Sequence, residues 1–255
     1  MNTDQVSATK EIYDQHFELW VRDQPTILSD YTARPRVLET LGNLNGLELL
    51  DLGCGEGYLA RKLAHAGASR VHGIDLSAEM IRAAIKQNES THLPITYETA
   101  DLRHWVPITQ TFDGAIGVFL LNYLRLDESL RVLQRTNDAL KPRGKLILTL
   151  PHPTLPWLRD ACAPFYFERP TLPYQLARDH VLSGRIWHRN GDSVPVQCFH
   201  KTIEDIHSLV HHAGFRIINV EELYVSQVHL ELDRDFFGPL QGTPLHILIN
   251  AEKLS

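Results

Sequence analysis

The sequence predicts an α/β fold, built as a mostly parallel sheet with helices on both faces, and three observations favour it. The chain has 255 residues, 43% of them hydrophobic, which is enough for a sizeable core at the upper end of one domain. From Leu47 onward, apolar segments of strand length alternate with amphipathic segments of helical period, as in a parallel sheet covered on both faces. Near the C-terminus two apolar segments follow one another, as in the antiparallel pair that often finishes a seven-stranded sheet.

Local signals place each element in chain order. Residues 1–45 are predicted to be helical, with Pro25 and Pro35 as interruptions. Ser77 is predicted to cap the helix that follows it, and the turn at residues 141–144 (Lys-Pro-Arg-Gly) ends a later helix. The predicted strands are 47–53, 70–76, 95–102, 112–121, 145–150, 215–225 and 245–253. The predicted helices are 58–66, 78–88, 126–140 and 201–213.

Residues 151–200 differ in composition from the rest of the chain. They hold seven of the 14 prolines and seven of the 21 aromatic residues, which is unlike a polar linker. We expect a substrate cap over the carboxyl ends of the strands, inserted after the fifth strand; a surface excursion or a dimer contact is the alternative. Residues 46–150 and 201–255 then form one α/β core, preceded by the helical segment 1–45.

Composition also bounds the class of protein. The net charge of −6, from 31 acidic and 25 basic residues, disfavours a general nucleic-acid or anionic-membrane surface. Three cysteines without CxxC spacing argue against a disulfide framework. No targeting segment or membrane span is visible, so a soluble, cytoplasmic protein is expected.

A glycine loop, Leu49-Leu50-Asp51-Leu52-Gly53-Cys54-Gly55-Glu56-Gly57, joins the first strand to its helix. Glycines at alternate positions allow a sharp turn and a close approach of ligand to backbone, at the sheet edge where α/β proteins bind ligands. The third glycine comes one residue earlier than in a dinucleotide fingerprint, where Tyr58 stands instead, and no Walker lysine follows. The loop therefore favours a cofactor without a pyrophosphate.

Acidic residues end the next two predicted strands. Asp75 lies 18 residues after Gly57, where a carboxylate can accept from both hydroxyls of a ribose; a carboxylate near a helix N-cap is the alternative. Asp101 can accept from an adenine amino group or act as a turn residue. Asp51 is expected to fix the glycine loop and to lie within reach of a ligand's ammonium group.

Four segments, LLDLGCGEGYLA, GIDLS, TADL and FDGAIGVFLLNYL, occur in this order and spacing. Together they resemble the class I S-adenosylmethionine-dependent methyltransferases of small-molecule type, strongly over residues 47–150 and weakly over the closing strands. The resemblance implies a Rossmann-like sheet of seven strands, and S-adenosylmethionine as cofactor with S-adenosylhomocysteine as product. It does not specify the methyl acceptor.

The resemblance also implies roles for single residues. Asp75 would hold the ribose hydroxyls, and Phe119 would offer its backbone carbonyl to the ammonium group. Tyr123 and Asn122 lie where the family places residues that face the reaction centre. Tyr13, from the N-terminal helix, would fold over the cofactor or else pack on the sheet edge. The remaining cofactor-binding candidates are Asp51, Leu52, Gly53, Gly55, Gly57, Leu76, Met80, Asp101 and Leu102.

A sulfonium methyl is already activated, so transfer needs an acceptor held in line and, for some acceptors, a general base. His152, between two prolines after the fifth strand, and His200, before the helix at 201–213, are the candidate bases, or turn histidines. No carboxylate cluster follows the fourth strand, so no metal is expected. We expect methyl transfer to an O or N atom of a small, aromatic or apolar metabolite. The alternatives are an RNA or protein methyltransferase and a non-catalytic, cofactor-binding regulatory protein; oligomeric state stays open.

Overall fold

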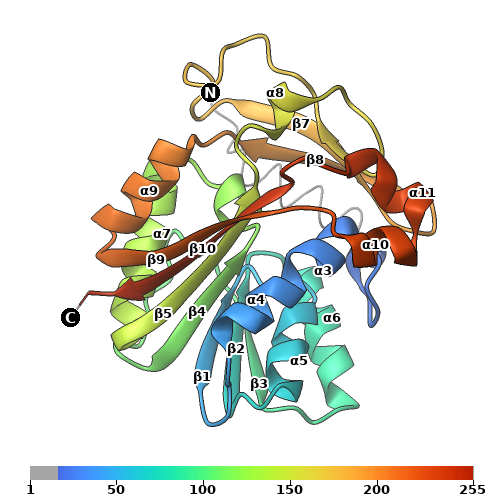
Figure 1. Cartoon of the computed structure of the whole chain (residues 1–255). Coiled ribbons are helices and arrows are strands. Elements are labelled where there is room, and N and C mark those ends of the chain that lie inside the picture. The colour runs from blue at the N-terminus through green and yellow to red at the C-terminus, as the bar shows by residue number, and fades with distance from the viewer. Residues whose placement is uncertain (1–16, 255) are drawn as a thin grey trace.

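The computed structural model describes residues 17–254 and contains a central sheet of seven strands in the order β3-β2-β1-β4-β5-β10-β9 (Figure 1). The first five in this order are parallel, and β10 pairs antiparallel with both β5 and β9. The predicted seven-stranded, mostly parallel sheet is therefore confirmed. The strands are β1 (Glu48–Leu52), β2 (Arg70–Asp75), β3 (Ile95–Thr99), β4 (Phe112–Val118), β5 (Leu140–Pro151), β9 (Phe215–Leu223) and β10 (His246–Lys253).

Helices cover both faces of this sheet, as predicted. Figure 1 shows α4, α5 and α6 on one side of the sheet and α7 and α9 on the other. Ser77 caps its helix as expected, because its side chain accepts a hydrogen bond from the Met80 amide. The first group comprises α4 (Arg34–Leu41), α5 (Tyr58–His65) and α6 (Ala78–Glu89), and the short helices α2 (Phe17–Trp20) and α3 (Leu28–Thr32) precede it in the chain. The second comprises α7 (Leu126–Ala139) and α9 (Ile203–His212).

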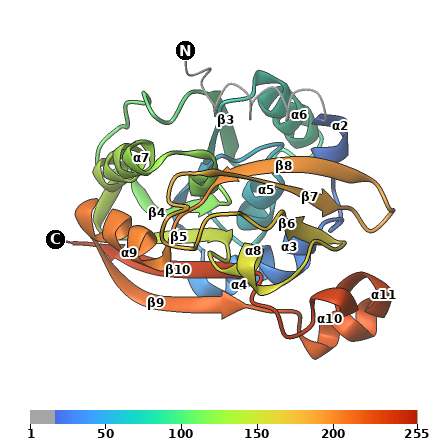
Figure 2. The ribbon, with the colours of Figure 1, turned by 90° about the horizontal axis from the view of Figure 1, so that it is seen from above.

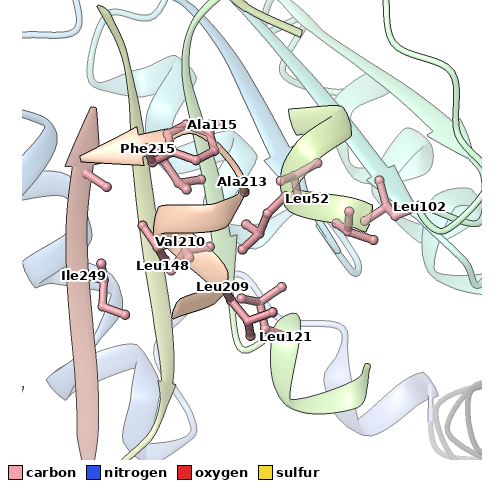
Figure 3. Packing of buried hydrophobic residues seen from close by; sticks show 14 of the residues in the cluster. Leu52, Leu102, Ala115, Leu121, Leu148, Leu209, Val210, Ala213, Phe215 and Ile249 are labelled. Atoms are coloured by element: carbon pink, nitrogen blue, oxygen red, sulfur yellow. The ribbon is translucent and has the colours of Figure 1, made fainter. Parts of the chain in front are cut away.

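The core is split by the sheet into two layers. On one face, Leu209 and Val210 of α9 pack with Leu148 of β5 and Leu121 beyond β4 (Figure 3). On the other face, side chains of α4 and α5 pack against β1, β2 and β4. Because both faces are apolar, the carboxyl-end edge of the parallel strands is the part of the sheet left for a ligand.

A second, smaller sheet lies above that edge (Figures 1 and 2). It has the order β6-β7-β8 and follows a short helix, α8 (Leu155–Leu158). Its strands pair antiparallel, and their apolar side chains join a third core cluster with Leu28 of α3 and Phe237 near the C-terminus. The strands are β6 (Phe165–Phe167), β7 (Val181–Trp187) and β8 (Ser193–Phe199).

Several details differ from the sequence predictions. The turn predicted at residues 141–144 lies within β5, because α7 ends at Ala139 and the strand begins at Leu140. The chain between the last two strands of the central sheet, where the sequence analysis assigned no element, contains α10 (Gln227–Leu232), α11 (Arg234–Phe237) and the 3₁₀ helix η2 (Gly238–Leu240). The fourth strand ends at Val118 rather than at residue 121, because Phe119 has a positive φ of 56° and a 3₁₀ turn, η1 (Leu121–Tyr123), follows. This bend directs residues 119–123 toward the space under the small sheet.

Candidate functional site

A cavity of about 220 Å³ lies between the carboxyl ends of the parallel strands and the small sheet. Three parts of the chain line it: the glycine loop with the ends of β2, β4 and the segment after β3, residues of the N-terminal segment between 20 and 34, and the small sheet together with His246. It therefore joins the predicted nucleotide side of the fold to the predicted cap.

The glycine loop has the backbone that the spacing of its glycines predicts. Gly53, Gly55 and Gly57 have φ values of 68°, 55° and 79°, which L residues with side chains rarely adopt. A Cβ on Gly55 would meet nothing within 4 Å and would project into open space, since Gly55 lines the cavity. A Cβ on Gly57 would collide with the Tyr97 hydroxyl. Gly55 thus keeps space for a ligand, whereas Gly57 allows close packing of the loop on β3.

The Asp75 carboxylate fixes the same loop from the end of β2. One oxygen accepts from the Gly55 amide at 2.8 Å, and the other accepts from the Ser77 amide at 2.9 Å. A carboxylate can accept more than one hydrogen bond on each oxygen, and this one also lines the cavity. Asp75 can therefore act near the helix N-cap and bind a ligand at the same time.

Asp51 lies deeper, with only 2% of its surface exposed. Its Oδ2 atom has no hydrogen-bond partner among the described residues, although the side chain borders the cavity. Burial raises the pKa of Asp51 to about 7, even though the charge of Arg34 acts to lower it. Within residues 17–254, the Oδ2 atom of Asp51 is therefore a buried acceptor without a donor.

Most predicted cofactor residues come together around the cavity. Leu52 and Gly57 lie behind the lining, and Tyr13 lies outside the described residues. Met80 combines both predicted alternatives, since it packs with Trp20 and also borders the cavity. The predicted residues that line the cavity are Asp51, Gly53, Gly55, Asp75, Leu76, Met80, Asp101, Leu102, Phe119 and Tyr123.

Asp101 borders the cavity with a partner that the sequence did not predict. Its carboxylate receives hydrogen bonds from the backbone and the guanidinium of Arg103, which also pairs with Glu128 at 2.9 Å. Burial raises the pKa of Asp101, but the hydrogen bonds from Arg103 outweigh it and the net shift is downward. Asp101 is therefore an ionised acceptor whose orientation is fixed.

The two histidines predicted as bases do not line this cavity. His152 lies 2.9 Å from Glu222 through Nε2 and 2.8 Å from the Thr154 hydroxyl through Nδ1. His200 contacts the Tyr174 carbonyl, and burial lowers its pKa to about 4. Both border a much smaller cavity of about 20 Å³, which shares Asn122, Phe167 and Cys198 with the larger one. The geometry supports structural roles for both histidines better than contact with an acceptor.

Buried ion pairs between charged side chains hold the N-terminal segment against the glycine loop, and the sequence analysis did not identify them. Asp30 accepts two hydrogen bonds from Arg22, each 2.9 Å long, and one of 3.0 Å from Arg34. Arg22 also reaches Glu56 of the glycine loop, and Glu56 pairs with Arg61 at 2.7 Å. The only feature of the sequence that pointed to these ion pairs was the spacing of four residues between Asp30 and Arg34.

His246, at the start of β10, is a second residue that sequence reasoning missed. It is 2% exposed and borders the cavity, and its ring lies edge to face with Phe119 at a centroid distance of 4.9 Å. A single histidine at the start of an apolar strand forms no periodic pattern, so the sequence does not mark it as a site residue. The order of the strands in the sheet places it beside the cavity. Among the described residues, no cluster of three or more potential metal ligands occurs.

The residues around the cavity suit the cofactor that the resemblance implies. Asp75 and Asp101 present acceptors at the ends of adjacent strands, and Gly55 leaves room above the loop. Asp51 offers an unpaired acceptor for a cationic group, while Arg34 brings a positive charge suited to a carboxylate. S-adenosylmethionine carries each matching group: ribose hydroxyls, an adenine amine, an ammonium and a carboxylate.

Comparisons with known proteins agree. Residues 49–144 match the family model described as a methyltransferase domain. An uncharacterised protein of Haemophilus influenzae is 30% identical over 94% of this chain and 95% of its own length. A ubiquinone biosynthesis O-methyltransferase of Coxiella burnetii is 32% identical, but the match covers only 46% of this chain and 49% of that protein.

A solved S-adenosylmethionine-dependent methyltransferase from Mesorhizobium loti superimposes with a TM-score of 0.66 at 25% identity, covering 86% of this chain and 96% of its own. The fold, the glycine loop with Asp75, and these matches lead to one assignment. This chain belongs to the class I S-adenosylmethionine-dependent methyltransferases and is an enzyme of that family.

Proposed function

We propose that this enzyme transfers the methyl group to an O or N atom of a small, aromatic or apolar metabolite. The observation that carries the proposal is the apolar lining supplied by the small sheet. Phe165 and Phe167 of β6, Ile186 of β7 and Val196 of β8 face the same cavity as the glycine loop. Such a lining favours an apolar acceptor, because it gives a charged chain no compensation for lost hydration.

In this proposal the polar half of the cavity holds the cofactor. Asp75 would bind the ribose hydroxyls and Asp101 the adenine edge, while Leu76 and Met80 would pack beside the adenine. Gly53 and Gly55 would lie under the methionine and ribose parts. Arg34 would meet the carboxylate, and Asp51 and the Phe119 carbonyl the ammonium group.

The bound cofactor supplies a methyl group that its sulfonium charge has already activated. The chain's own task is to hold the acceptor atom near that methyl carbon, in line with the sulfur, and to exclude water. The small sheet and residues 20–34 close the cavity from two sides and suit this task.

The two alternatives make different demands on the surface. An RNA substrate calls for a basic surface, whereas the chain has a net charge of −6. A protein substrate calls for an open groove for an extended chain. A regulatory protein would bind the cofactor with the same loop and transfer nothing.

A labelled-methyl assay separates these three functions. The enzyme and methyl-labelled S-adenosylmethionine are incubated in three parallel samples. The first contains neutral aromatic alcohols and amines, the second total tRNA, and the third ribosomal protein. Label in the small-molecule samples is expected. Label only in RNA or protein would overturn the proposal, and cofactor binding by calorimetry without any transfer would favour a regulatory role.

A further inference from the structure

The apolar half of the cavity contains two buried polar side chains that have unused hydrogen-bonding atoms. Both ring nitrogens of His246 lack a hydrogen-bond partner among the described residues. The Oδ1 atom of Asn122 lacks one as well. His246 is 2% exposed and Asn122 is 4% exposed, yet both side chains border the cavity. Burying such atoms without a partner costs free energy, so a site that retains them is suited to a ligand that supplies the partner.

Aromatic rings surround the imidazole and shape its environment. The ring of His246 lies 4.9 Å from that of Phe119 and 5.8 Å from that of Phe165, and Phe165 lies 5.3 Å from Phe167. All four rings border the cavity. Together they form an aromatic wall, which favours a flat ligand that stacks or packs edge to face.

The imidazole is neutral in this wall. Burial lowers the pKa of His246 to about 3, and the positive charge of Arg34 adds to the effect. A neutral imidazole has one N–H donor and one acceptor nitrogen. The acceptor nitrogen fits a ligand that donates an O–H or N–H, and the apolar surroundings disfavour a charged one.

We propose that His246 and Asn122 hold the methyl acceptor, an uncharged planar compound that donates an O–H or N–H hydrogen bond to the imidazole. This inference rests on the proposed small-molecule function and narrows its substrate class. His246 contacts the methyl acceptor directly. If the methyl acceptor carries a second O–H or N–H group, that group donates a hydrogen bond to Asn122 Oδ1.

The position of the imidazole also provides for the proton that methylation releases. A lone pair of the acceptor's O or N atom forms the bond to the methyl carbon, and the electron pair of the broken C–S bond stays on sulfur. The acceptor's proton passes to the acceptor nitrogen of the imidazole and is released to solvent when the products leave the cavity, since a group with so low a pKa does not retain it. Because the sulfonium charge disappears as the imidazolium forms, the net charge of the cavity does not change during the step.

Binding of matched aromatic pairs to the enzyme saturated with S-adenosylhomocysteine tests the proposal. The pairs are phenol with fluorobenzene and 2-naphthol with 2-fluoronaphthalene, since fluorine is close to a hydroxyl in size but donates nothing. We expect the hydroxyl member of at least one pair to bind about tenfold more tightly, the effect of one well-formed hydrogen bond. His246→Phe keeps the aromatic wall and should abolish this preference, and Asn122→Leu should leave it intact for these single donors.

Thr149→Val provides the matched control. Thr149 is also buried, with an unpartnered Oγ1 atom among the described residues, but it does not line the cavity. Its variant should keep the wild-type preference. Equal affinity within both pairs, a preference that survives in His246→Phe, or tighter binding of 2-naphthoate than of 2-naphthol would overturn the inference.

Failure of the inference can be separated from failure of the proposed function. Aromatic probes that bind wild type and His246→Phe equally would leave a small-molecule site without the assigned contact. Absence of binding by every aromatic probe to the S-adenosylhomocysteine complex would overturn both.

Discussion

The Asp75 carboxylate accepts a hydrogen bond from the Gly55 amide at 2.8 Å, across 20 residues of sequence. This contact joins the end of β2 to the loop after β1, so one side chain both shapes the loop and faces the cavity. Loop geometry and cofactor recognition therefore depend on the same residue.

Replacement of Asp75 tests that dependence. Asp75→Ala should weaken S-adenosylmethionine binding about ten- to hundredfold, because hydrogen bonds to a charged group are lost from both the loop and the ligand. Calorimetric titration measures the change. Asp113→Ala is the control: Asp113 also accepts from a backbone amide, that of Glu48 at 2.9 Å, but does not line the cavity. Equal effects of the two variants would contradict the assignment.

Gly55→Val tests the space above the loop. A β-branched residue is strained at a φ of 55°, and its side chain would extend into the cavity. We expect cofactor binding to fall below detection by calorimetry. Gly191→Val is the control. Gly191 also has a positive φ, 95°, and open surroundings, but it does not line the cavity, so this variant should lose stability and keep cofactor binding. Micromolar cofactor binding by Gly55→Val would argue against this loop as the site.

The N-terminal segment should depend on Asp30. Its side chain is fully buried and pairs with Arg22 and Arg34, so Asp30→Asn leaves Arg34 without its counter-ion and Arg22 with Glu56 alone. The expected loss of unfolding free energy is about 3–5 kcal/mol, measured by denaturant titration. Asp127→Asn, which breaks an exposed pair with Arg131, should cost less than about 1 kcal/mol.

The sign of the pH dependence follows from the same contacts. Burial raises the pKa of Asp30, but Arg34 and Arg22 outweigh it, and the net pKa lies below its ordinary value. The stabilisation is therefore present above the unfolded pKa, about 4, and is lost as pH falls through the folded one. Asp30→Asn should flatten this acid limb of the stability curve. An unchanged acid limb would show that the pair contributes little.

The sequence predicted those parts of the fold and site that depend on local signals. The glycine loop, Asp75 and the Ser77 cap depend on residues close together in the chain, and the structure confirms the strands and helices that they begin or end. His246 and Asp30 acquire their surroundings only through strand order and burial, which one sequence does not reveal. For the same reason, the flanking prolines of His152 suggested a base near the site, although the side chain turns toward Glu222 instead.

Asp51 should couple cofactor binding to proton release. Burial raises its pKa to about 7, so near neutral pH the carboxyl group is partly protonated in the free enzyme. A cationic ligand beside it favours the ionised form and lowers the pKa. Binding of S-adenosylmethionine near pH 7 should therefore release a fraction of a proton, and its affinity should rise from about pH 6 to about pH 8. Calorimetry at one pH in phosphate and in Tris, which differ in ionisation enthalpy, measures the protons released. Asp51→Asn should bind with the same enthalpy in both buffers, whereas buffer-independent enthalpy in the wild type would exclude Asp51 as the partner of the cationic group.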